Sequence, residues 1–90
     1  MKKEKQMITK VLYRKYANGI DSGFYGGIEY AFKTDLPLVA GDKVLVPSGT
    51  DNELKRALVV DVNVDPNTIE PWVLKILKPI TEYDPEGVAY

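Results

Sequence analysis

Few side chains in this chain could take part in catalysis. Histidine and cysteine are both absent, which removes the commonest general base, the commonest metal ligand and every thiolate. Asp61 and Asp65 share one face of a predicted strand, but strand rise would place them about 13 Å apart, too far for a shared acid–base pair. The run Asp51–Glu53 is rich in oxygen but too short for a dedicated calcium loop. We therefore expect a protein that is not an enzyme and that holds no cofactor and no metal.

Length and composition indicate one small globular domain. The chain has 90 residues, of which 44% are hydrophobic and 28% charged, as in ordinary globular domains. No apolar run reaches the roughly 20 residues that span a bilayer, and the N-terminal segment lacks the apolar region of a signal peptide. We expect one domain over residues 1–81, a flexible acidic tail over residues 82–90, a cytoplasmic location and no membrane partner.

The charges are distributed unevenly along the chain. Residues 1–16 carry six basic side chains against one acidic, whereas residues 17–90 carry six basic and twelve acidic. A basic head of this kind can steer a polyanion to one side of a domain. The plainer interpretation is a solvated strand followed by a solvated acidic remainder, which also argues against strong non-specific binding of DNA.

The candidate residues must be positioned by strands, because apolar and polar residues alternate almost throughout. Alternation predicts strands over residues 6–16, 27–34, 43–47, 57–65 and 72–80. In the fourth strand it groups Leu58, Val60, Val62 and Val64 on one face. Residues 18–27 include four glycines and predict irregular structure, with Phe24 and Tyr25 as either a stacking platform or a lid over the core. Pro47 should end its strand or mark a bulge.

Five short strands without a long helix predict an all-β fold. A small five-stranded SH3-like antiparallel barrel matches the length best, and an OB-like barrel is the alternative.

The stretch from Gly27 to Thr81, about 55 of 90 residues, resembles a particular family. The pair Glu29-Tyr30, the segment GDKVLVPSG over residues 41–49, and Leu74-Lys75 stand in the order and spacing of the N-terminal 3′-DNA-end-binding domain of the primosomal replication-restart helicase, primosomal protein N′. No phosphate-binding loop of the helicase is present. The resemblance therefore implies a free-standing version of the domain, of the kind a phage or mobile element could encode.

The resemblance also implies a binding site for the last nucleotide of a DNA strand. In that site Ile28 would contact the base and Glu29 would accept a hydrogen bond from the free 3′-hydroxyl. Gly49 would allow close approach of the backbone, and Lys75 would meet a phosphate. The chain departs from the family at Ile28 and Ser48, where aromatic residues are usual, and at Glu29, which replaces aspartate.

Each of these residues also has a plainer interpretation. Gly49 can be a turn residue with positive φ, Lys75 a solvated lysine and Glu29 an exposed strand carboxylate.

The first function that we expect is a module for single-stranded or 3′-ended DNA, with replication proteins as further partners. The second is a protein-interaction or self-association module without a nucleic-acid role, and an unusual carboxylate enzyme is a distant third.

Overall fold

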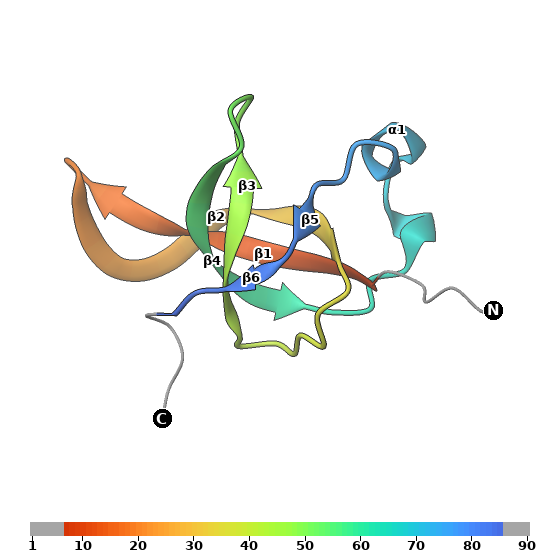
Figure 1. The fold of residues 1–90 in the computed structure, drawn as a ribbon, viewed down its shortest axis with the longest axis horizontal. Helices are drawn as coiled ribbons and strands as arrows, with labels where there is room; N and C mark the ends of the chain where they lie inside the picture. The colour runs from red at the N-terminus through yellow and green to blue at the C-terminus, as the bar shows by residue number, and fades with distance from the viewer. Residues whose placement is uncertain (1–6, 86–90) are drawn as a thin grey trace.

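Two antiparallel hairpins make up most of the structure, a computed structural model that describes residues 7–85 (Figure 1). The first hairpin joins β1 (Met7–Ala17) to β2 (Ile20–Thr34), and the second joins β3 (Lys43–Ser48) to β4 (Glu53–Asp61). The 3₁₀ turn η1 (Pro66–Thr68), the short helix α1 (Pro71–Leu74), β5 (Pro79–Ile80) and β6 (Glu82–Tyr83) follow. The strand order in the one sheet is β5-β2-β1-β4-β3-β6.

The first hairpin turns at Asn18 and Gly19. Their φ angles are 52° and 80°, and Ala17 pairs directly with Ile20. A two-residue turn with positive φ at both positions suits the twist of the flanking strands, and Asn-Gly is the residue pair that favours it most. The prediction of irregular structure over residues 18–27 is therefore wrong, because β2 begins immediately after this turn.

Two bulges in β2 accommodate the remaining glycines of that segment. Val11 pairs with Tyr30 while Tyr13 pairs with Gly26, so β2 has two more residues than β1 in this interval. Between the pairs Arg14–Tyr25 and Tyr16–Asp21, nearer the turn, β2 again has two more residues than β1. Gly27 takes positive φ in the first bulge and Gly23 in the second. Because the pairing of β1 with β4 ends at Tyr13, the end of the hairpin extends beyond the rest of the sheet (Figure 1). We call residues 14–28 the hairpin arm.

The second hairpin follows the prediction closely for β3 and less closely for β4. β3 contains Pro47 instead of ending at it, and Pro47 pairs with Leu54. β6 pairs only with Val44 and Leu45, so no ladder at the outer edge of β3 requires the N–H that Pro47 lacks. β4 begins at Glu53, four residues before the predicted start at residue 57.

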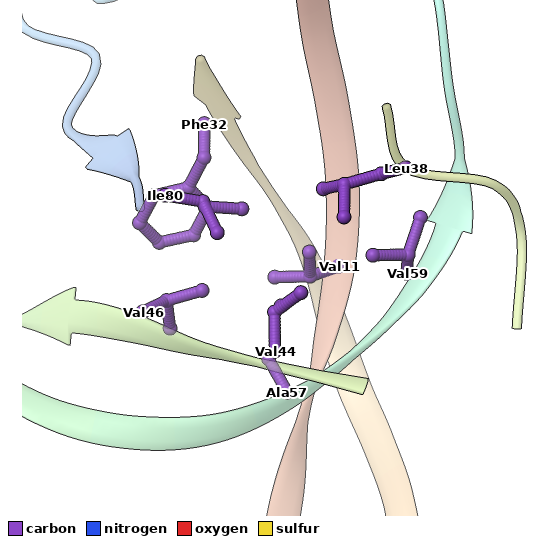
Figure 2. Packing of buried hydrophobic residues seen from close by; sticks show 8 residues of the cluster. All are labelled: Val11, Phe32, Leu38, Val44, Val46, Ala57, Val59 and Ile80. Carbon is purple, nitrogen blue, oxygen red and sulfur yellow. The ribbon is translucent and has the colours of Figure 1, made fainter. Parts of the chain in front are cut away.

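The core lies on the concave face of the curled sheet. Figure 2 shows its eight buried side chains pointing toward one another, from all four long strands, β5 and the β2–β3 connection. They are Val11, Phe32, Leu38, Val44, Val46, Ala57, Val59 and Ile80. In β4 the buried residues are Ala57 and Val59, whereas Leu58 and Val60 are half-buried. The face of β4 that we expected to be buried is therefore not the one that enters the core.

Residues 72–80 do not form the predicted fifth strand. Pro71 occupies the first helical position of α1, where its fixed φ favours a helical turn and its missing N–H costs nothing. The amides of Val73 and Leu74 both donate to the carbonyl of Glu70. Trp72 and Ile76, both within the predicted fifth strand, are 63% and 62% exposed.

The C-terminal segment connects the two edges of the sheet. β5 pairs in parallel with β2 at one edge, and β6 pairs antiparallel with β3 at the other. Only Thr81 separates them, and two consecutive Cα–Cα steps reach at most about 7.6 Å. The sheet must therefore curl until its edges nearly meet. The segment that bridges them runs across the sheet (Figure 1).

The fold is all-β, but it differs from the predicted five-stranded barrel. The sheet has six strands, and within residues 7–85 no ladder joins β5 or β6 to the opposite edge, so hydrogen bonds do not close it. The ordered domain also extends past the predicted boundary at residue 81. Glu82 and Tyr83 form β6, and Asp84 is buried. The rest of the predicted tail, residues 86–90, lies outside the described residues.

Candidate functional site

The four residues implied by the family resemblance lie on three different elements. Ile28 and Glu29 are exposed on β2, Gly49 lies in the β3–β4 turn, and Lys75 is the exposed residue that follows α1. No hydrogen bond or ion pair joins any two of them in the described part of the chain. Of the four, only Gly49 lines the hollow described below.

The bulge at Gly27 explains why Ile28 faces solvent. Residues 27–29 are the inserted residues opposite Leu12, so they leave the regular ladder. Ile28 is 71% exposed as a result. Tyr30 pairs with Val11, so Tyr13 is its diagonal neighbour on the same face, and the two rings stack with centroids 5.0 Å apart and planes at 17°. The bulge therefore removes Ile28 from the ladder, while Tyr13 and Tyr30 form an aromatic pair beside it.

This pair forms one wall of an open hollow of about 190 Å³. The hollow also contacts Phe32, the β3 corner over residues 47–49, and the segment after α1 that ends at Lys78. Pockets for drug-sized ligands measure about 300–1,000 Å³. The hollow therefore suits a single ring-sized group, and Tyr30, which is 44% exposed, offers it an aromatic surface.

Lys78 brings a positive charge to the rim of the hollow. Its Nζ donates a hydrogen bond of 2.6 Å to the carbonyl oxygen of Gly49. Gly49 has a φ of 73°, so its interpretation as a turn residue is correct, and its carbonyl also fixes the lysine. Among residues 7–85, no carboxylate forms an ion pair with Lys78.

Sequence reasoning missed Lys78 because residues 72–80 were interpreted as a strand in which Lys75 was the functional lysine. Glu70-Pro71 is the signal that could have revealed the error, since proline favours the first position of a helix. The helical turn places Lys75 at its C-cap and leaves Lys78 directly before β5.

A network of charges lies at the base of the hairpin arm. Arg14 donates to Asp21 from Nε at 2.6 Å and from Nη2 at 3.2 Å, and its guanidinium lies 4.8 Å from the centre of the Tyr25 ring. Arg56 of β4 bridges Asp21 at 3.4 Å and the buried Asp84 at 3.3 Å. The network therefore connects the arm, β4 and the residue that follows β6.

The hydrogen bonds from Arg14 and from the backbone N–H of Gly23 hold the pKa of the Asp21 carboxyl below its usual value. Asp21 therefore stabilises the fold fully above its unfolded-state pKa of about 4, and this contribution is lost as the pH falls through the lower folded value. We expect Asp21→Asn to reduce the acid dependence of the melting temperature below about pH 4. Melting curves from pH 6 to pH 2 measure the effect. An unchanged slope in Asp21→Asn would contradict the assignment.

No helix in the described range, residues 7–85, has the length and apolar character needed to cross a membrane. Comparison of the chain with protein-family models, curated proteins and solved structures found no match.

Proposed function

We propose that this chain is a non-catalytic module that binds the 3′ end of single-stranded DNA in the hollow beside Tyr13 and Tyr30. The observation that carries the proposal is a stacked tyrosine pair, with the Tyr30 side exposed, at the wall of a ring-sized hollow with a lysine at its rim. Stacking of bases on aromatic side chains is the common means by which proteins hold single strands, and every base offers a π-face for it.

The residues of the hollow fit the separate parts of a nucleotide. Tyr30 can stack on the base. Gly49 has no Cβ, so the DNA can approach the protein backbone closely at this corner. Lys78 offers a compact charge to phosphate. In this assignment Tyr30 replaces Ile28 as the residue that contacts the base, and Lys78 replaces Lys75 at the phosphate. Glu29 is adjacent to Tyr30 in the chain but does not line the hollow, so in this proposal it contacts the 3′-hydroxyl from outside the hollow.

The charge of the molecule supports recognition of an end more than binding along a strand. The net charge is −1, so a long polyanion gains little general attraction. A terminal nucleotide needs only one or two phosphate contacts.

The curl of the sheet and its near-closure through residues 79–83 support our further proposal that the domain is an SH3-like barrel, with an OB-like barrel as the alternative.

Titration of a labelled duplex with a 3′ single-stranded overhang tests the function. We expect binding at micromolar protein in low salt, with a slope of log K against log salt of about −0.7 for each phosphate contacted, hence no steeper than about −1.4. A 5′ overhang or a 3′-phosphorylated overhang should bind more weakly. Absence of binding, or equal binding to all three substrates, would overturn the proposal.

A second candidate function, protein interaction or self-association, has its own support in the hairpin arm. Ile20, Phe24 and Ile28 are each 71–72% exposed along it, and large exposed apolar surface commonly marks an interface. Light scattering at high protein concentration tests self-association. A mass equal to that of the monomer would exclude self-association, and interaction with a different protein would remain as the second candidate function.

A further inference from the structure

A second hollow lies beside the first. It measures about 370 Å³ and is lined by Leu45, Pro47, Asn52, Leu54, Lys78, Pro79 and Thr81. It shares Pro47 and Lys78 with the hollow of the tyrosine pair. The two hollows are therefore neighbours, with Lys78 at their boundary.

The geometry of Lys78 suits an anion at this boundary. An ammonium group has three N–H donors, and one of them is directed at the carbonyl of Gly49. This bond holds Nζ at the boundary while the other two donors stay available. Within the range 7–85, no carboxylate forms an ion pair with Lys78.

The walls of the second hollow suit a nucleoside. Leu54 is 49% exposed and, with Pro47 and Pro79, offers an apolar surface. The Asn52 side chain carries both donors and an acceptor for a sugar or a base edge. The order is therefore the tyrosine hollow, the Lys78 ammonium and the wider apolar hollow. A dinucleotide has the matching order of base, phosphate and second nucleoside.

We propose that the two hollows are adjacent subsites for the last two nucleotides of a single strand, with the phosphodiester between them bound by Lys78. The inference rests on the proposed function and adds to it the length of strand recognised. The terminal base occupies the tyrosine hollow, and the penultimate nucleoside lies over Leu54 and Pro47. The charge of Lys78 selects a phosphodiester at the boundary, since it is matched by the one negative charge of that group.

NMR titration with thymidine, the dinucleotide TpT and TpT with an uncharged methylphosphonate linkage tests the proposal without altering the protein. We expect the wild-type chain to bind TpT about tenfold more tightly than either neutral ligand, as loss of a charge-assisted hydrogen bond implies. Chemical shifts at Leu54 should move with TpT and not with thymidine.

Two substitutions test the same subsite from the protein side. Lys78→Met should remove the preference for TpT over its methylphosphonate, while Lys78→Arg should keep it. Leu54→Ala, which lies outside the tyrosine hollow, should lower the affinity for TpT and leave that for thymidine unchanged. Lys55→Met, at an exposed lysine paired with Glu53, is the matched control and should change neither affinity. Thymidine binding also reports that each variant is folded.

The outcomes separate the two proposals. If thymidine, TpT and the methylphosphonate bind equally, or if Lys78→Met weakens all three alike, the second subsite is wrong while 3′-end binding stands. If none of the ligands binds and the overhang duplex does not bind either, both proposals are wrong.

Discussion

Replacing Ile80 with alanine should lower the free energy of unfolding by about 2–5 kcal/mol, as for other buried isoleucines. Ile80 is 1% exposed and packs in the core cluster, and its carbonyl accepts a hydrogen bond of 2.8 Å from the buried Thr34 hydroxyl. Its side chain anchors the segment that connects the two edges of the sheet. Small domains have only about 5–15 kcal/mol of stability in total, so this single truncation removes a large share. Urea unfolding followed by circular dichroism gives the value.

Ile76→Ala is the matched control, because it makes the same truncation four residues earlier. Ile76 is 62% exposed, and surface substitutions usually change stability by less than about 0.5 kcal/mol. If both variants lost the same stability, residues 79–80 would not anchor the connecting segment as the structure indicates.

Replacing Tyr30 with alanine should weaken binding of a 3′-overhang duplex by about 5- to 150-fold, the equivalent of about 1–3 kcal/mol for the loss of one stacked base. The substitution removes the exposed ring of the Tyr13–Tyr30 pair. Tyr30→Phe should retain most of the affinity, because stacking requires the ring and not the hydroxyl. Fluorescence anisotropy with a labelled overhang measures both variants.

Tyr16→Ala provides the comparison for Tyr30→Ala. Tyr16 lies on the hairpin arm and is 52% exposed, close to the exposure of Tyr30, but it does not line the hollow. Its loss should leave the affinity within about twofold, because no stacking contact is removed. Equal losses in the two variants would indicate that the DNA lies elsewhere on the protein.

Local patterns predicted the parts of the fold that depend on neighbours in the chain. Alternation located β1 and β3 close to their observed bounds, and the structure shows Val44 and Val46 as the buried residues of β3. The turn at Asn18-Gly19 was equally predictable from the residue pair alone. It was missed because the glycines that follow it indicated a loop, although two of them serve bulges within a strand.

The candidate site was predictable only in part. Gly49 was identified through the family resemblance, and it does line the hollow. The sequence predicts Tyr13 and Tyr30 to be core or core-edge aromatics, and Tyr13 does pack against the core. Alternation does not show that the two rings stack at the wall of a hollow. Lys78 could not be selected over Lys75 without knowing that residues 71–74 form a helical turn.

The sequence by itself determined that the chain forms an all-β domain of short strands, because alternation, glycine turns and the absence of helical periodicity are local properties. Only the tertiary structure decided which edge each of the last strands joins and where the hollows lie. β5 and β6 contain two residues each, too few to show a pattern. Their pairing depends on how far the whole sheet curls, and that curl arises from the summed twist and bulges of the long strands. The same curl brings Lys78 to the carbonyl of Gly49, 29 residues away in the chain.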